Sequence, residues 1–378
     1  MSAFRFAWLP FIVVYTILSL TAANTWAQVR FAPPQNYAAS GDLTFVAVAD
    51  LNHDGKLDVV VANQDGGVGV LLGNGDGTLR PVVTYDTTLS ASSLAVADFN
   101  GDGKLDIALA STTVGFDLLL GNGDGTFGSP VHYAGGESVR SVVAADFNGD
   151  GFPDVVLADG GFLDCGGIDV FLNNGDGTFA APVMSQTECG PVGIVAGDFN
   201  EDGKVDLAVT NVGVTAVGFM LGNGDGTLQP YQLLSFTSFP IGVVAVDLNG
   251  DGHLDIVCAN SGSLNVSLFG GHGDGTFTDL GSLNTGFNAH SVAAADFGNH
   301  RIDLATPNDG FGGFPNNVSV MMHVSRGFLP QKTFATGLYP YWIATGDLNG
   351  DGKVDIVTAN EEGGVSVLLN VSRVVLFP

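Results

Sequence analysis

A short acidic segment recurs along this chain and constrains its fold more than any other feature. The segments follow the form Asp-x-Asn-x-Asp-Gly-x-x-Asp, with one departure, and begin at Asp50, Asp98, Asp146, Asp198, Asp247, Asp296 and Asp347. They recur about every 50 residues, a period typical of solenoids, propellers and repeat arrays. Such a chain folds as stacked copies of one supersecondary unit, so the repeat has to be interpreted before any domain boundary is drawn.

Each repeat has the pattern of four short β-strands. In the second repeat, apolar runs occur at 94–97, 107–110 and 116–120. A Gly-Asn-Gly-Asp-Gly-Thr turn follows, and a fourth strand is expected at 127–133. Four antiparallel strands per repeat are typical of one propeller blade. Runs that are apolar on both faces are expected where each sheet lies between two neighbouring sheets.

The sequence therefore predicts an all-β, seven-bladed β-propeller of four-stranded antiparallel blades over residues 28–378. The expected blades lie at about 43–85, 91–134, 139–184, 191–234, 240–283, 289–335, and 340–370 together with 30–37. The last repeat lacks the glycine-rich turn and the fourth strand, whereas 31–37 matches 127–133 at its Phe, Pro and Tyr residues. We expect this N-terminal strand to complete the last blade, because closure of the ring removes exposed strand edges.

Residues 1–27 are expected to be a signal peptide. Arg5 precedes an apolar run at 6–20, and the small residues that follow provide a cleavage site after Ala27. The run is too short for a convincing membrane span, and an uncleaved N-terminal anchor is the alternative. We expect a secreted or cell-surface protein with no membrane span in the mature chain.

The charge of the chain restricts its partners. The formal net charge is −27, and Lys and Arg together number only 12. Phosphate contacts need clustered Lys and Arg, so nucleic-acid binding is not expected. The acidic residues recur in a fixed pattern instead of forming a tail, which indicates a role for each of them.

The chain has three cysteines, too few for a disulfide-dense scaffold. Cys165 and Cys189 are expected to form a disulfide, because alternating strand directions bring their two connections to one face and export implies an oxidising compartment. Two free thiols are the alternative. Cys258 lies in an apolar run and is expected to be a buried hydrophobic residue.

The acidic segments have the composition of calcium-binding loops. In the first loop, the expected ligands are the side chains of Asp50, Asn52, Asp54 and Asp58 and the backbone carbonyl of Lys56. Calcium takes about six to eight oxygen ligands, which alternate positions of one loop can wrap around a single ion. The equivalent side chains are Asp98, Asn100, Asp102, Asp106; Asp146, Asn148, Asp150, Asp154; Asp198, Asn200, Asp202, Asp206; Asp247, Asn249, Asp251, Asp255; and Asp347, Asn349, Asp351, Asp355. The equivalent carbonyls belong to Lys104, Phe152, Lys204, His253 and Lys353.

Turns rich in Asp and Asn are the alternative interpretation, since Asp, Asn and Gly are ordinary turn residues. The carboxylates crowded into each loop repel one another without a cation, which favours about six calcium ions per chain. The Gly-Asp-Gly-Thr turns are expected to be hairpin turns, and a second metal site in each repeat is the weaker alternative.

The sixth segment departs from the pattern. Residues 296–303 are one residue short and lack the middle Asp and the turn glycine, so no calcium is expected there. We expect Arg301 to bridge Asp296 and Asp303, because a guanidinium can bond two carboxylates. An Arg301 that points to solvent is the alternative.

Residues 46–58 and 71–79 carry the motifs Val-Ala-Val-Ala-Asp-Leu-Asn-His-Asp-Gly-Lys-Leu-Asp and Leu-Leu-Gly-Asn-Gly-Asp-Gly-Thr-Leu. They resemble FG-GAP/VCBS repeats, which are also the repeats of the integrin α-subunit propeller and of some calcium-containing fungal lectins. The resemblance covers 30–370 and implies that the loop between the first two strands of a blade binds calcium on the lower face. It does not imply enzymatic activity, and bacterial members of the family include suspected adhesins.

No Ser/His/Asp set, His-rich metal cluster or isolated carboxylate pair points to an enzyme. The connections that face away from the acidic loops carry side chains suited to a glycan or extracellular protein ligand: Phe236, Phe239, Phe287, His290, Phe311, Phe314, Tyr339, Tyr341 and Trp342. Packing at the rim is the alternative role of these side chains. We expect a secreted, calcium-binding module for ligand binding or adhesion. A structural cell-envelope component is the alternative, and a propeller-fold hydrolase or lyase is a weaker one.

Overall fold

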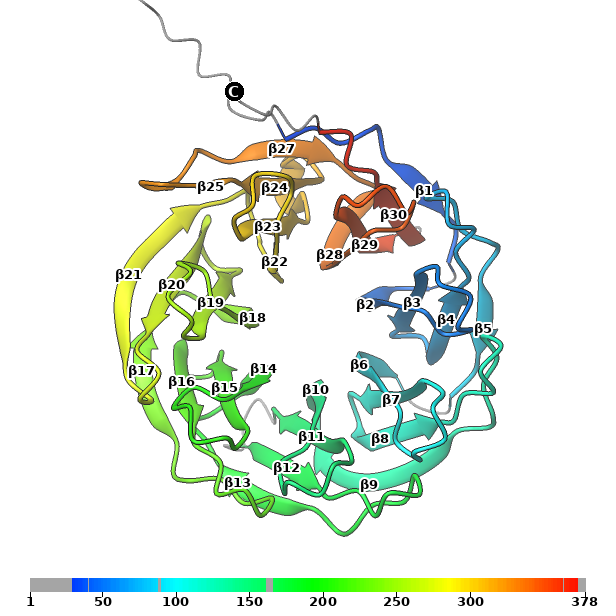
Figure 1. Cartoon of the computed structure of the whole chain (residues 1–378), viewed down its shortest axis with the longest axis vertical. Helices are drawn as coiled ribbons and strands as arrows, with labels where there is room; N and C mark the ends of the chain where they lie inside the picture. The colour runs from blue at the N-terminus through cyan, green and yellow to red at the C-terminus, as the bar shows by residue number, and fades with distance from the viewer. Residues whose placement is uncertain (1–28, 40, 88–89, 161–165, 363, 373–378) are drawn as a thin grey trace, which may run out of the picture.

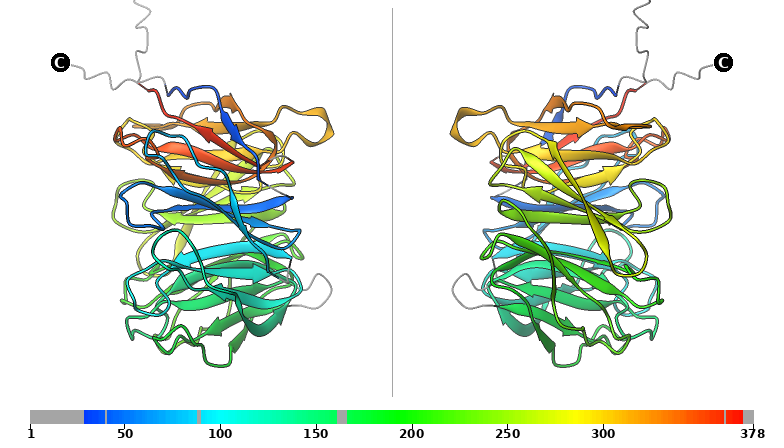
Figure 2. Two further views of the ribbon diagram at one scale, coloured as in Figure 1. Left: turned by 90° about the vertical axis from the view of Figure 1, so that its right-hand side faces the viewer. Right: turned by 90° about the vertical axis from the view of Figure 1, so that its left-hand side faces the viewer.

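The computed structural model describes residues 29–39, 41–87, 90–160, 166–362 and 364–372. Seven four-stranded antiparallel sheets surround a central axis, with the strands of each sheet following one another outwards (Figure 1). Each sheet is one blade, so the predicted seven-bladed propeller is confirmed. Figure 2 shows the disc from the side, with connections at both faces.

The first five blades follow the chain in order. Their strands are β2 (Leu43–Ala49), β3 (Asp58–Asn63), β4 (Gly67–Leu71), β5 (Val83–Tyr85); β6 (Ala91–Ala97), β7 (Asp106–Ser111), β8 (Val114–Leu119), β9 (Val131–Glu137); β10 (Val139–Ala145), β11 (Asp154–Asp159), β12 (Gly167–Phe171), β13 (Val183–Gln186); β14 (Pro191–Gly197), β15 (Asp206–Asn211), β16 (Ala216–Met220), β17 (Gln232–Phe236); and β18 (Pro240–Val246), β19 (Asp255–Asn260), β20 (Asn265–Gly271), β21 (Phe277–Asn284).

Blade 6 is the least regular. It consists of β22 (Ala293–Ala295), β23 (Asp303–Asn308), β24 (Asn317–Met321) and β27 (Lys332–Ala335). The short helix η1 (Phe311–Gly313) follows β23, and the hairpin of β25 (His323–Val324) and β26 (Gly327–Phe328) precedes β27.

The two ends of the chain close the ring in blade 7. Strands β28 (Leu338–Gly346), β29 (Asp355–Glu362) and β30 (Gly364–Leu368) are completed by β1 (Gln35–Tyr37), which lies antiparallel to β30. Asn36 pairs with Ser366, and an isolated bridge joins Phe31 to Asn370. The predicted closure is therefore confirmed, with a strand shorter than the expected 30–37.

The fourth strand of blade 2 begins at Val131 and not at Phe127. Phe127 instead forms an isolated bridge with Gly121 and is 8% exposed. Pro130 has no N–H group for a sheet ladder, so regular pairing starts after it. Blades 2 to 5 also end a few residues later than expected, the first strand of blade 6 begins at Ala293, and blade 7 begins at Leu338.

The hydrophobic core is divided among the interfaces between blades. Seven clusters of buried apolar residues lie one at each interface around the ring. Leu43 and Val59 of blade 1 pack with Val357 and Val365 of blade 7. The series of apolar interfaces is therefore continuous around the ring. Every sheet buries both faces, which explains the continuous apolar runs in the sequence.

The strand directions give the propeller two different faces. Loops between the first and second strands, such as 50–58, emerge at one face, here called the Asp face. Connections between the second and third strands emerge at the other, here called the opposite face. The expected signal peptide, 1–27, lies outside the described residues. Among those described, no helix has the length and apolar character needed to cross a membrane.

Candidate functional site

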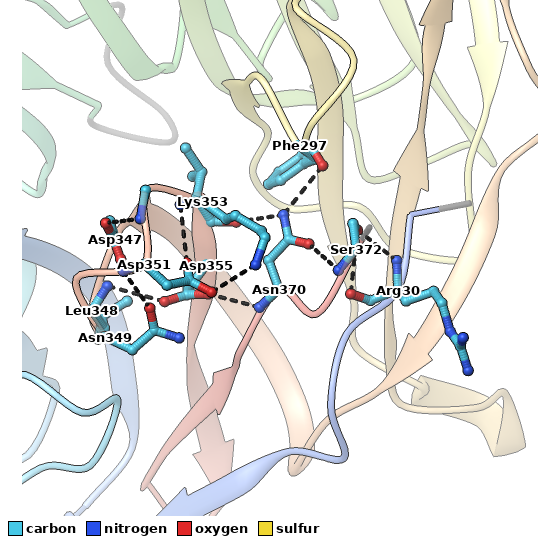
Figure 3. Close-up of polar contacts among 12 residues, drawn as sticks. Arg30, Phe297, Asp347, Leu348, Asn349, Asp351, Lys353, Asp355, Asn370 and Ser372 are labelled. Atoms are coloured by element: carbon cyan, nitrogen blue, oxygen red, sulfur yellow. Dashed lines mark hydrogen bonds and ion pairs between the residues drawn. The ribbon is translucent and has the colours of Figure 1, made fainter. Parts of the chain in front are cut away.

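Each loop of the Asp face is held by hydrogen bonds between its own side chains and backbone. In blade 7, the Asp347 carboxylate accepts hydrogen bonds from the backbone N–H groups of Asp351 (3.1 Å) and Gly352 (2.7 Å) (Figure 3). Asn349 Oδ1 also accepts from Asp351 N–H, at 3.0 Å. Gly352 has φ 79°, a conformation that glycine adopts without strain and that reverses the chain here.

The other five complete loops repeat this geometry. In all six, the first Asp accepts the N–H groups of the residues four and five positions later; these aspartates are Asp50, Asp98, Asp146, Asp198, Asp247 and Asp347. The repeated motif therefore corresponds to one repeated loop conformation.

The last Asp of each loop is buried and fastens the loop to the sheet. Asp355 is 0% exposed, and its carboxylate accepts hydrogen bonds from the N–H groups of Leu348 (3.0 Å) and Asn370 (2.7 Å) (Figure 3). Burial raises the pKa of Asp355 to about 6, the two N–H donors oppose this rise, and the charges of Asp351 and Asp347 add to it. Burial is also the main cause of raised pKa values at Asp58, Asp106, Asp154, Asp206 and Asp255.

These loops match calcium in donor chemistry but not in the convergence of their carboxylates. All the proposed donors are oxygens, and Asp50 and Asp54 are near enough to Asp58 to raise its pKa. Within the described part of the chain, however, no three or more His, Cys, Asp or Glu side chains gather as they would around a metal ion. The carboxylates accept backbone N–H groups instead, as in turns rich in Asp and Asn. Calcium binding stays a prediction.

In the sixth loop, Asn299 takes the place that was predicted for Arg301. The Asn299 amide Nδ2 donates to Asp303 Oδ1 (2.9 Å) and to the His323 carbonyl (2.9 Å), while its backbone N–H donates to Asp296 Oδ1 (2.8 Å). Arg301 is exposed and forms no ion pair with any residue that the structure describes. The predicted bridge is therefore wrong: Asn299 bonds Asp303 through its side-chain amide and Asp296 through its backbone N–H.

The Gly-Asp-Gly-Thr turns connect neighbouring blades. Gly77 N–H donates to the Leu348 carbonyl in the Asp loop of blade 7 (3.1 Å), and the same contact occurs between blades 2 and 3, 3 and 4, and 4 and 5. Gly77 has φ 84°, and a Cβ there would lie 2.6 Å from Leu369 Cδ2 of the adjacent blade, so both the backbone conformation and this contact favour glycine. Asp76 Oδ1 accepts the Thr78 N–H (2.9 Å), which stabilises the turn.

A cavity of about 240 Å³ opens on the axis at the opposite face. We call it the axial mouth. It is lined by Thr44, Gln64, Ser92, Thr112, Arg140, Gly160, Val192, Val212, Ile241, Tyr341 and Trp342. The mouth therefore combines hydroxyl, amide, aromatic, aliphatic and cationic side chains within one cavity.

Part of the predicted aromatic set meets at this mouth. Tyr341 and Trp342 line the cavity, and the rings of His290 and Tyr341 are stacked with centroids 4.3 Å apart. Trp342 also packs in the core between blades 7 and 1, so the packing role holds for part of this side chain.

The rest of the predicted set lies elsewhere. Phe287 and Phe314 stack on each other, 4.5 Å between centroids. Phe236 is 68% exposed and Phe239 is 51% exposed, whereas Tyr339 is half-buried. Phe311 belongs to η1, and its side chain lies outside the description. Ligand binding by these residues stays a prediction.

Sequence reasoning overlooked Arg140 and its polar neighbours in the mouth. A signal for them was present: the position six residues before the first Asp of each segment is Thr44, Ser92, Arg140, Val192, Ile241, His290 and Tyr341. These residues differ in chemistry although the acidic segments that follow them are almost identical. Alignment of the repeats on their first Asp would have exposed this variable position.

The predicted disulfide includes Cys165, which lies outside the described residues, so the Cys165–Cys189 bridge stays a prediction. Cys258 is a free thiol and is 0% exposed, as expected for a residue of the β19 core.

Comparison with solved structures supports the fold. BBS1N in complex with ARL6DN, in crystals soaked with mercury, matches with a TM-score of 0.62 and 11% identity, over 90% of this chain and 96% of that chain. An Agrocybe aegerita lectin, described for recognition of non-reducing terminal N-acetylglucosamine, matches with a TM-score of 0.55 and 19% identity, over 88% of this chain and 94% of that chain. At these identities the matches show a shared fold alone.

Comparison of sequences identifies the repeats. No curated protein matches the chain. The FG-GAP-like repeat family matches residues 50–109, 98–157, 146–209, 200–258 and 247–306, and the FG-GAP repeat family matches 339–368. The matched segments span most of the propeller and together contain all seven acidic segments. The chain therefore belongs to the FG-GAP repeat family.

Proposed function

We propose that this propeller is a secreted, calcium-stabilised binding module that holds a glycan or an extracellular protein at its opposite face. The observation that carries the proposal is the contrast between the two faces. The Asp face repeats one loop conformation six times, as suits a structural role. The axial mouth has different side chains from different blades, as suits recognition of a particular ligand.

The related folds are consistent with binding as the activity. The BBS1N propeller was crystallised with a protein, ARL6DN, and the fungal lectin recognises a sugar. Neither ligand is transferred to this chain by such distant similarity. The comparison supports only the use of the propeller as a scaffold on which different binding sites are built.

Calcium would be held on the Asp face by the loop residues named above, such as Asp347, Asn349, Asp351 and Asp355 with the Lys353 carbonyl. A bound ion would supply positive charge among carboxylates that otherwise repel one another. The fold already places Asp355 beside the loop by burying it against Leu348 and Asn370 N–H groups. Residues 1–27 would direct export to a compartment where calcium is abundant.

A saturable ligand on the opposite face is the direct test. The secreted form would be applied to arrays of glycans and of extracellular proteins, with calcium and with chelator. Tyr341→Ala and His290→Ala, which alter the aromatic side of the axial mouth, should weaken binding. Arg301→Ala, an exposed change on the Asp face, should leave it unaltered. Absence of any saturable ligand would favour a structural cell-envelope protein.

A further inference from the structure

The residues around the axial mouth are turned out of the sheets by β-bulges. In blade 1, Leu43 pairs with Asn63 and Phe45 with Ala62, so Thr44 has no partner in the ladder. The same shift leaves out Ser92, Arg140, Val192 and Tyr341 in their blades. A bulge redirects one side chain and is common next to functional sites. Here the bulges present one residue from each of five blades to the same cavity.

The lining of the mouth is divided by chemistry. Blades 1 and 2 contribute Thr44, Gln64, Ser92 and Thr112. The Thr44 and Ser92 hydroxyls donate to the Ala91 and Ala110 carbonyls, so toward a ligand their oxygens act as hydrogen-bond acceptors. Blades 4 and 5 contribute an aliphatic wall of Val192, Val212 and Ile241. A ligand for this cavity therefore needs several polar groups on one side and an apolar surface on the other.

Arg140 is the charged residue among the lining side chains, and the fold makes room for it. A Cβ at Gly160 would lie 2.9 Å from Arg140 Cγ and 2.4 Å from the Pro191 carbonyl oxygen. Arg140 is exposed, and no ion pair involves it within the described residues. Its guanidinium fork therefore remains available to a carboxylate ligand.

Acidic groups lie across the mouth from Arg140. Burial raises the pKa of Tyr341, the charges of Glu361 and Asp309 raise it further, and the charge of Arg140 lowers it. Asp309 Oδ2 lies 2.7 Å from Asn288 Nδ2 and 3.0 Å from His290 Nε2. The negative charge on this side of the mouth repels a second carboxylate.

Backbone strain is concentrated beside the same residues. Ser138, Phe239, Asn288 and Tyr339 have φ of 59°, 51°, 59° and 52°. Each lies two residues before the position that precedes the first Asp of its segment by six: Arg140, Ile241, His290 or Tyr341. In blade 4, Gly190, with φ 70°, lies two residues before Val192, the equivalent residue of that blade. Left-handed non-glycine residues persist where the surrounding structure holds them, often at ligand sites.

We propose that the axial mouth binds a single carboxylated sugar residue, with its carboxylate on the Arg140 guanidinium and its ring against Tyr341 and Trp342. The hydroxyl groups of the sugar face the Thr44–Gln64–Ser92–Thr112 wall. A bidentate pair of guanidinium and carboxylate gives the strongest directional contact in the cavity. The formal charge of −27 opposes a polyanion, which favours one carboxylate per ligand.

This inference rests on the proposed function and names the ligand class of the same face. The test is calorimetric titration of the full exported chain with glucuronate, N-acetylneuraminate, the methyl ester of glucuronate, and glucose. We expect at least one of the two acids, glucuronate or N-acetylneuraminate, to bind. The affinity for glucuronate is compared directly with the affinities for its methyl ester and for glucose. Loss of the charge–charge contact should weaken affinity at least about tenfold. Equal affinity for glucuronate and its ester, or no binding of either acid, would overturn the inference.

Variants locate the contact. Arg140→Gln should weaken binding of the acid by at least about tenfold and leave the melting temperature unaltered, whereas Arg140→Lys should restore part of the affinity. Arg301→Gln removes the same charge from the Asp face and should change nothing. An unaltered affinity in Arg140→Gln would refute the assignment. If the arrays instead identify a neutral glycan or a protein ligand, the carboxylate inference fails and the proposed binding function stands. If no saturable ligand of any class is found, both fail.

Discussion

Asp117 and Asp169 occupy the same position in the third strands of blades 2 and 3 but differ in their neighbours. Asp117 pairs across the sheet with His132, whose Nδ1 lies 2.9 Å from Asp117 Oδ1. Asp169 pairs with Met184, is 1% exposed, and has no hydrogen-bond partner for either oxygen within the described structure. Burial, with a contribution from the charge of Asp159, raises the pKa of Asp169 to about 6.

The raised pKa of Asp169 predicts that the free energy of unfolding depends on pH. The folded-state pKa of Asp169 lies above the unfolded value of about 3.9, so the folded state binds this proton more tightly. Its contribution to stability is full below about pH 4 and is lost as the pH rises through about 6. Asp169→Asn should therefore stabilise the protein at pH 8 by roughly 1–3 kcal/mol and much less at pH 4, measured by urea unfolding. Asp117→Asn, which weakens the pair with His132, should not stabilise it. An equal effect of Asp169→Asn at both pH values would contradict the prediction.

At the scale of an element, the sixth loop shows how one blade keeps its shape without the repeated motif. Asp303 is 0% exposed and accepts hydrogen bonds from the N–H groups of Phe297 and His323 as well as from the Asn299 amide. The amide thus connects the loop to the sheet and to the β25 hairpin. In this loop the neutral Asn299 amide donates to the buried Asp303 carboxylate. The other loops are one residue longer and carry one more Asp.

Asn299→Ala should destabilise blade 6 because it leaves Asp303 and the His323 carbonyl short of a donor. Each unsatisfied buried group costs about 1–3 kcal/mol of stability. We therefore expect faster hydrogen exchange of backbone amides in this variant, confined to β22–β24. The effect should be the same with calcium and with chelator. Arg301→Ala should leave exchange unaltered, since this side chain is exposed. Faster exchange in Arg301→Ala and none in Asn299→Ala would restore the arginine bridge.

For the whole molecule, the ring depends on contacts between residues from opposite ends of the chain. Strand β1 completes blade 7, and Val29 and Phe31 pack into the core between blades 6 and 7. Ser372 Oγ accepts the Arg30 N–H at 2.9 Å, and Ser372 N–H donates to Asn370 Oδ1 at 3.0 Å (Figure 3). The closing segment therefore adds sheet, core and polar contacts together.

Removal of residues 29–39 from the mature chain should open the ring at blade 7. Loss of β1 exposes the edge of β30 and part of the blade 6–7 core, so we expect lower stability and self-association through the free edge. Urea unfolding and size-exclusion chromatography measure the two effects. Removal of residues 373–378, beyond the closing contacts, serves as the control. A truncated protein as stable and monomeric as the parent would refute closure by β1.

Calcium dependence also belongs to the whole molecule, because the loops occur in nearly every blade. Each occupied site should stabilise the fold by about 2.7 kcal/mol when free calcium is a hundredfold above its Kd. Thermal melts with calcium and with chelator should therefore differ by many degrees, and metal analysis should find about six ions per chain. Coincident melts would remove calcium from the proposed function and leave the Asp loops as self-contained turns.

Much of this architecture could be predicted from the sequence because its determinants are local. The period of the acidic segments, the three apolar runs of each repeat and the match of 31–37 to 127–133 predicted seven blades and their closure. The loop conformation also follows from short-range chemistry, since Asp347 bonds N–H groups only four and five residues away.

Only the tertiary structure decided which residues distant in the sequence meet. Asn299 reaches the His323 carbonyl, 24 residues away, and that contact displaced the ion pair expected of Arg301. Bulges in separate strands bring Thr44, Arg140 and Tyr341 to one cavity, although the chain separates them by whole blades. Repetition in the sequence determines the scaffold because each blade folds by the same local rules. The individual chemistry of the axial mouth arises only when the ring closes and places residues from different blades around one axis.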